Sequence, residues 1–66
     1  MNMKLLKKII DSKGIKYQYL AGKLGISRES LYNKLNGKTE FTAGEIRNMA
    51  DALSLSFATI QEIFFE

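Results

Sequence analysis

Apolar residues recur at helical spacing along the whole chain, beginning with Leu5, Leu6, Ile9 and Ile10. No segment alternates apolar and polar positions with period two for long enough to suggest a strand. The pattern therefore predicts an all-α fold. Five helices are expected, over residues 2–13, 17–24, 28–35, 43–53 and 57–65.

The residues between these segments are typical of helix ends. Gly25 suits the left-handed conformation that stops a helix, and Ser27 suits the N-cap of the next one. Thr42 and Glu45 have the spacing of a capping box, in which each side chain satisfies a free backbone N–H. The second helix has the weakest expected start, because Lys16 occupies the place of a capping residue.

The periodicity also predicts the core of one small domain that spans residues 1–66. With 45% hydrophobic residues, the chain has enough apolar surface for a compact bundle. Tyr19 is expected to pack half-buried, whereas Lys4, Lys7 and Lys8 are expected on a solvated face. Beyond the first helix, the residues expected to pack inside are Leu20, Ala21, Leu24, Ile26, Leu31, Leu35, Phe41, Ala43, Ile46, Met49, Ala50, Leu53, Leu55, Ile60, Ile63 and Phe64.

The composition argues against several classes of function. The chain has no His and no Cys, which removes the usual general base, the commonest metal ligand and the thiolate sites. There is no clustered carboxylate pair and no phosphate-cradling glycine loop, so we expect no enzyme activity, metal or cofactor, and no small-molecule substrate is evident. No apolar run has the roughly 20 residues of a membrane span, and the N-terminus lacks a signal-peptide pattern. We therefore expect a soluble cytoplasmic protein.

Charge is distributed unevenly along the chain. Residues 1–38 hold nine Lys/Arg against two acidic residues, a net charge of +7. Residues 39–66 hold one Arg against five acidic residues, a net charge of −4. Such segregation indicates that the N-terminal part has a polyanionic partner.

Residues 17–38 lie within the positive part and combine two short helix patterns, a glycine turn and an Asn-Gly stop. Two helices joined in this way form a helix-turn-helix, whose second helix can enter the major groove of double-stranded DNA. Four exposed residues of that helix are then placed to read base edges. Arg28 can donate two hydrogen bonds to guanine, Asn33 can pair with adenine, and Glu29 can accept from cytosine. Tyr32 can touch a thymine methyl group or a phosphate.

Phosphate contacts are expected where helices begin and just beyond the third helix. Tyr17 and Gln18 lie at the start of the second helix, and Asn36 and Lys38 follow the third. Glu29 would repel phosphates unless it read a base or had a partner within the helix, such as Lys34. Asn36-Gly37 also suits an ordinary helix stop.

Four short runs carry a family resemblance: Leu20-Ala21, Leu24-Gly25-Ile26-Ser27, Leu31, and Asn36-Gly37-Lys38-Thr39. Together they resemble the Cro/C1-type (Xre-family) helix-turn-helix of phage repressors and their bacterial relatives. The resemblance covers nearly the whole chain and implies a lambda-repressor-like bundle of five helices, with the motif in the second and third. It implies a sequence-specific transcriptional regulator of the phage-repressor type, bound as a homodimer to a palindromic operator.

Two positions depart from that pattern. Tyr17 stands where many relatives have a Gln that braces the third helix and holds a phosphate. Lys34 stands at a commonly apolar position, and we expect Leu35 to take over its packing. A small rotation of the third helix would follow, and it would bear most on Asn33.

A second function is compatible with the same fold. The acidic, Phe-rich C-terminal third would suit a protein-binding module, such as an antitoxin or an accessory factor that holds another protein. If the protein is instead a repressor, the expected dimer contact is the end of the fourth helix, residues 54–56 and the last helix. Exposure of Phe57, Phe64 or Phe65 would support a partner there, because large apolar patches rarely face water.

Overall fold

Five α-helices and no strand make up the molecule, and the computed structural model describes all residues from Met1 to Glu66. The all-α prediction is therefore confirmed, and Asn2 and Phe65 prove to be caps rather than helical residues. The helices are α1 (Met3–Lys13), α2 (Tyr17–Leu24), α3 (Arg28–Leu35), α4 (Ala43–Leu53) and α5 (Phe57–Phe64).

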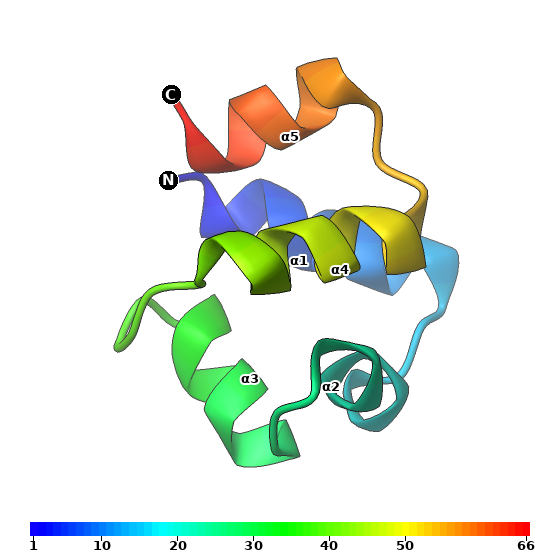
Figure 1. Cartoon of the computed structure of the whole chain (residues 1–66). Helices are drawn as coiled ribbons and strands as arrows, with labels where there is room; N and C mark the ends of the chain where they lie inside the picture. Colours follow the sequence, from blue (N-terminus) through cyan, green and yellow to red (C-terminus); the bar gives the residue numbers. More distant parts are fainter.

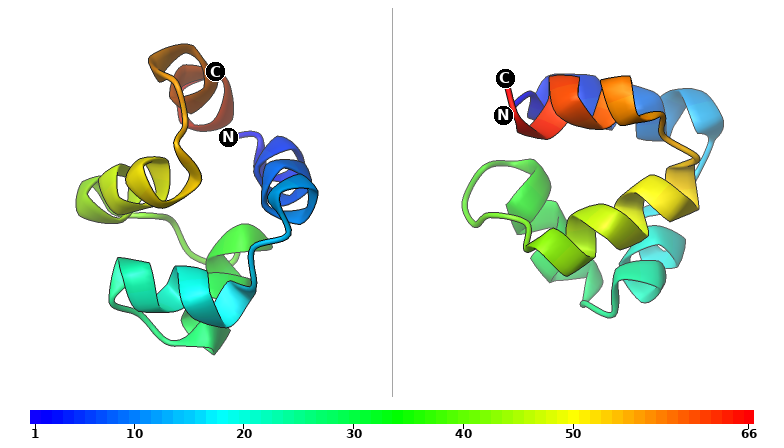
Figure 2. Two further views of the ribbon diagram at one scale, coloured as in Figure 1. Left: turned by 90° about the vertical axis from the view of Figure 1, so that its right-hand side faces the viewer. Right: turned by 45° about the horizontal axis from the view of Figure 1, so that its top comes forward.

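Helices α1 and α4 run through the middle of the molecule, with α5 beyond them on one side and α2 and α3 on the other (Figure 1). A turned view separates α1 from α4 and keeps α5 opposite the α2–α3 pair (Figure 2). Helix α2 packs on α3 and α4, whereas α1 packs on α3 and α5. The termini lie close together, where the Asn2 N–H donates to Ile63 O at 2.6 Å. The α2–α3 pair thus occupies its own end of the molecule.

The helix ends follow the predicted cap chemistry. Ser27 Oγ accepts from the Ser30 N–H at 3.0 Å, and Gly25 adopts a left-handed φ of 72°. Thr42 and Glu45 form the expected capping box. Lys16 makes no side-chain cap, as its sequence predicted. The end of α2 and the starts of α3 and α4 therefore follow from the residues at those positions.

The core draws on every helix. Twelve side chains are buried, and none of them is polar or charged. Phe41, from the loop before α4, packs edge-to-face against Phe64 of α5 with ring centroids 5.8 Å apart. This contact joins the loop before α4 to α5. The buried residues are Leu6, Ile10, Leu20, Ala21, Leu24, Leu31, Leu35, Phe41, Met49, Leu53, Ile63 and Phe64.

Four predictions about exposure are wrong, and one of them concerns Asn33, which is half-buried rather than exposed. Ala43 is exposed, because it is the first residue of α4 and precedes the turn that packs on the core. Tyr19 is 56% exposed. Its position is about 100° from Leu20, on the side away from the other inward residues of α2. Lys7 is half-buried rather than fully solvated.

Candidate functional site

The turn between α2 and α3 is short because backbone groups close it tightly. The Gly25 N–H donates to Gly22 O at 3.2 Å, and the Ile26 N–H donates to Ala21 O at 3.1 Å. This pairing of helix-end carbonyls is the usual way a left-handed glycine ends a helix. Ala21 is buried where α2 packs on the neighbouring helices. The start of α3 is therefore held in a fixed relation to α2.

Helix α3 divides into an anchored face and an exposed face. Leu31 and Leu35, one turn apart, are buried almost completely. Arg28, Glu29 and Tyr32 are exposed on the same helix. The two leucines thus fix the rotation of α3 and present its polar side to solvent.

Four predicted site residues line one open hollow of about 530 Å³. Tyr17 comes from the start of α2, and Arg28, Glu29 and Tyr32 come from α3. A neighbouring hollow of about 350 Å³ includes Gln18 together with Tyr17 and Arg28. Five of the eight predicted residues therefore share one continuous surface at the α2–α3 end of the molecule.

Tyr17 is half-buried at the centre of that surface. Burial raises the pKa of the Tyr17 phenol above 10.0, and Asp11 and Tyr32 add to the rise. The hydroxyl therefore remains protonated at neutral pH. A protonated phenol can donate a hydrogen bond to an anionic oxygen.

The remaining three predicted residues lie along and beyond the end of α3. Asn33 is half-buried and does not line the hollow. The next residue, Lys34, is also half-buried. Asn36 is exposed, and its Nδ2 donates to Tyr32 O at 2.9 Å. Lys38 is exposed, and its backbone N–H donates to Asn33 O at 2.9 Å. These residues border the surface rather than forming its centre.

Lys34 is not the partner of Glu29. Its ammonium lies 3.1 Å from Glu45 Oε1, donates to Glu40 O at 2.9 Å, and sits 5.8 Å from the ring centroid of Phe41. The sequence could not reveal this, because the partners become neighbours only when α3 and α4 dock. Glu29 therefore remains a free carboxylate on the exposed face of α3.

The same contact changes the titration of Glu45. Burial is the largest single influence and works toward a higher pKa for Glu45. The hydrogen bond from the Thr42 N–H, with the hydrogen bond and charge of Lys34, outweighs it and lowers the pKa of Glu45 below 4.5. An ionised Glu45 therefore holds the C-terminal end of α3 to the start of α4.

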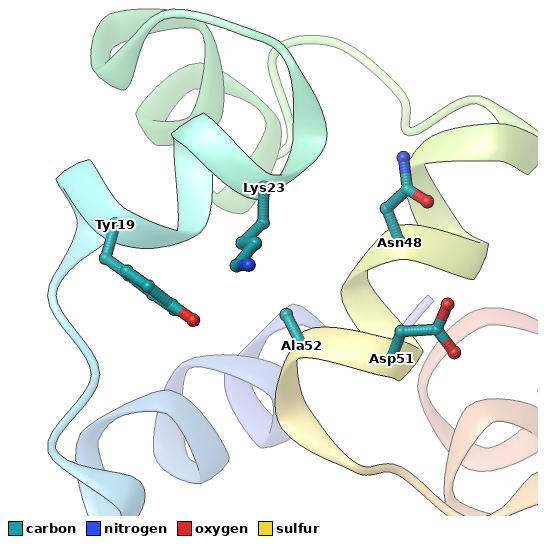
Figure 3. A pocket seen from close by; sticks show the side chains of 5 residues that line it. All are labelled: Tyr19, Lys23, Asn48, Asp51 and Ala52. Carbon is teal, nitrogen blue, oxygen red and sulfur yellow. The ribbon is translucent and has the colours of Figure 1, made fainter.

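A separate hollow of about 340 Å³ lies between α2 and α4 (Figure 3). Tyr19 and Lys23 line it from α2, with the Lys23 ammonium 5.4 Å from the Tyr19 ring centroid. Asn48, Asp51 and Ala52 line it from α4. One cation and one carboxylate leave the hollow without net charge. It includes none of the eight predicted residues.

Helix α5 presents a different kind of surface. Phe57 is 80% exposed and Phe65 is 69% exposed, whereas Phe64 is buried. No group of three or more His, Cys, Asp or Glu side chains comes together as a metal-binding cluster would. No helix is long and apolar enough to cross a membrane. The molecule therefore offers a surface at α2–α3 that combines one cation, one carboxylate and two tyrosines, and exposed phenylalanines in and just beyond α5.

One family model matches residues 2–66, and its description is a protein of unknown function, DUF739. No curated protein and no solved structure matches the chain. Because the match spans almost every residue, the chain belongs to the DUF739 family.

Proposed function

We propose that the protein is a sequence-specific DNA-binding transcriptional regulator, of the repressor type found in phages and mobile elements. Helix α3 would lie in the major groove as the second helix of a Cro/C1-type helix-turn-helix. The observation that carries the proposal is the shared surface of Tyr17, Arg28, Glu29 and Tyr32. These residues come from two helices joined by a tight turn, in the part of the chain that has a net charge of +7.

The exposed chemistry of α3 suits base reading. The Arg28 guanidinium can bond guanine O6 and N7 together, and the free carboxylate of Glu29 can accept from a cytosine amino group. Tyr32 is 56% exposed and offers both a ring face for a thymine methyl group and a hydroxyl. A mixture of one cation, one anion and one aromatic ring favours selection among base pairs over attraction to any phosphate backbone.

Phosphate contacts would surround that helix. The protonated Tyr17 hydroxyl and Gln18 lie at the N-terminus of α2, whose free N–H groups also favour anions. Asn36 and Lys38 lie beyond the other end of α3. Phosphate holders on both sides of α3 would fix its register in the groove.

The size of the domain favours a dimer on DNA. Its longest dimension is 27 Å, whereas half-sites one helical turn apart are separated by about 34 Å. One copy therefore covers one half-site, and a palindromic operator calls for two. The exposed Phe57, in α5, and Phe65, just after it, suit the contact between copies, because α5 lies on the opposite side of the molecule from α2 and α3 (Figure 1).

Selection of binding sites from a random pool of double-stranded DNA, repeated at two salt concentrations, tests the proposal. We expect an enriched inverted repeat with half-sites one turn apart, and affinity that falls as salt rises. Binding without enrichment, or no binding, would contradict a sequence-specific regulator.

The exposed phenylalanines favour one second candidate, a module that holds another protein. In that reading, α5 and its acidic surroundings bind the partner, and α3 is an ordinary solvated helix. Sedimentation of the protein alone and with its enriched DNA separates the two. If the protein forms a dimer and Phe57→Ser abolishes it, the dimeric regulator is supported. If the protein stays a monomer and does not bind DNA, the protein-binding module is supported.

A further inference from the structure

Lys7 of α1 reaches the end of α3. Its ammonium donates to Asn36 Oδ1 at 2.8 Å, across 29 positions of sequence. Asn36 is the C-cap of α3, and its own Nδ2 donates to Tyr32 O at 2.9 Å. A chain of two hydrogen bonds thus links α1 to the backbone of α3 at Tyr32.

No carboxylate neutralises Lys7. The one ion pair in the molecule is Lys34–Glu45, and the Lys7 ammonium has a single hydrogen-bond acceptor, the Asn36 amide oxygen. An ammonium has three N–H donors, so two remain free. The full positive charge of Lys7 is therefore available to an anion from outside the molecule.

The position of Lys7 is also restrained. Its side chain is half-buried against the helices, and the bond to Asn36 holds the ammonium beside the end of α3. Binding would therefore freeze little further side-chain motion, unlike the ordering of a fully exposed lysine. Lys8, the next residue on α1, is exposed and has no such bond.

We propose that Lys7 contacts a backbone phosphate of bound DNA, at the edge of the surface formed by α2 and α3. The proposal rests on the proposed DNA-binding function. It extends the site to α1, which sequence reasoning assigned to a solvated lysine face. It also gives Asn36 a second role, because its amide oxygen holds the Lys7 ammonium beside the end of α3.

The test compares Lys7→Met with the unmodified protein and with Lys8→Met, on the DNA that the protein itself selects. Methionine keeps the aliphatic stem of the lysine and removes the charge. Affinity falls as salt rises, and loss of one phosphate contact reduces the steepness of that fall, in log affinity against log salt, by about 0.9. The ratio of unmodified to variant affinity should therefore shrink by about 3.5-fold between about 50 mM and about 200 mM salt. Lys8→Met should leave the slope close to that of the unmodified protein.

Lys7→Arg and Lys7→Gln complete the set. Arginine keeps the positive charge, so Lys7→Arg should have the salt dependence of the unmodified protein. Glutamine can still donate a hydrogen bond to Asn36 but has no charge, so Lys7→Gln should show the weaker salt dependence of Lys7→Met. A slope that is unchanged in both Lys7→Met and Lys7→Gln would show that the lysine only braces Asn36, and it would overturn this inference alone. Absence of DNA binding by the unmodified protein would instead overturn the proposed function and the inference with it.

Discussion

Helices α3 and α5 have the same local design. Each has eight residues and begins after a serine N-cap with extended backbone angles. Ser27 Oγ accepts from the Ser30 N–H at 3.0 Å, and Ser56 Oγ accepts from the Thr59 N–H at 3.1 Å. Each helix also contributes two buried apolar residues to the core.

The clearest difference between the two helices lies in the residues that they expose to solvent. Helix α3 exposes Arg28, Glu29 and Tyr32, whereas α5 exposes Phe57 and leads to the exposed Phe65. Caps and buried residues determine that a helix forms and how it is rotated. The exposed residues determine what the helix can bind, which is why the proposal assigns DNA to α3 and a protein surface to α5.

Truncation of the core should have the largest effect, and it should be alike in the two helices. Leu31→Ala and Ile63→Ala each remove a side chain with no exposed surface. Each should lower the free energy of unfolding by about 2–5 kcal/mol, from lost burial and the cavity left behind. Urea unfolding monitored by circular dichroism measures this. A small loss for Ile63→Ala beside a large loss for Leu31→Ala would mean that α5 is not integral to the fold.

Removal of the arginine of α3 should separate binding from stability. Arg28→Ala should weaken binding to the selected DNA by about 1–3 kcal/mol and relax the preference at one base pair. Stability should change little, because the side chain is exposed. Fluorescence anisotropy with single-base variants of the site measures both quantities.

Arg47→Ala is the matched control for that experiment. Arg47 is the one basic residue of 39–66, and it is exposed on α4. Arg47→Ala should leave the base preference of DNA binding intact. An equal loss on every DNA sequence for Arg28→Ala would contradict its role in base reading.

The cap serines should give a smaller and again symmetrical effect. Ser27→Ala and Ser56→Ala each leave one N–H of the first helical turn without its acceptor. Each should cost about 1 kcal/mol of stability. Thermal unfolding compares the two directly. DNA affinity should fall further for Ser27→Ala than for Ser56→Ala, and the reverse order would count against α3 as the DNA-facing helix.

Removal of the ion pair between α3 and α4 should have the smallest effect on stability, and that effect should appear at acidic pH. Because the folded pKa of Glu45 lies below 4.5, its stabilisation is present above that pH and is lost as pH falls through the folded pKa. Glu45→Gln should reduce the acid sensitivity of the unfolding midpoint. Glu62→Gln, on exposed α5, is the control. Identical pH profiles for the two variants would contradict the tie at Glu45.

The sequence predicted most of the fold because its signals are local. The left-handed Gly25, the serine caps and the Thr42–Glu45 box act within a few residues, so helix boundaries follow from short windows. The error at Tyr19 arose because an aromatic residue near an apolar stripe suggests packing, while three smaller residues already fill the inward face of α2. The spacing of apolar residues shows which side of a helix faces the core, but not how many neighbouring residues are buried with it.

The site could be predicted less completely. Tyr17, Arg28, Glu29 and Tyr32 were named from sequence, and the structure brings them together. The roles of Lys34 and Lys7 depend on docking of distant helices, since their partners are Glu45 and Asn36. The departure of Lys34 from a commonly apolar position was the only signal of such a contact. For Lys7 the sequence held none.

Titration of the labelled protein with its selected DNA, followed by backbone amide chemical shifts, tests directly whether α3 faces the DNA. We expect the largest shifts on Tyr17, Arg28 and Tyr32, with any shifts at α5 smaller and dependent on pairing of two copies. Shifts confined to α5, with the amides of α3 unmoved, would contradict it.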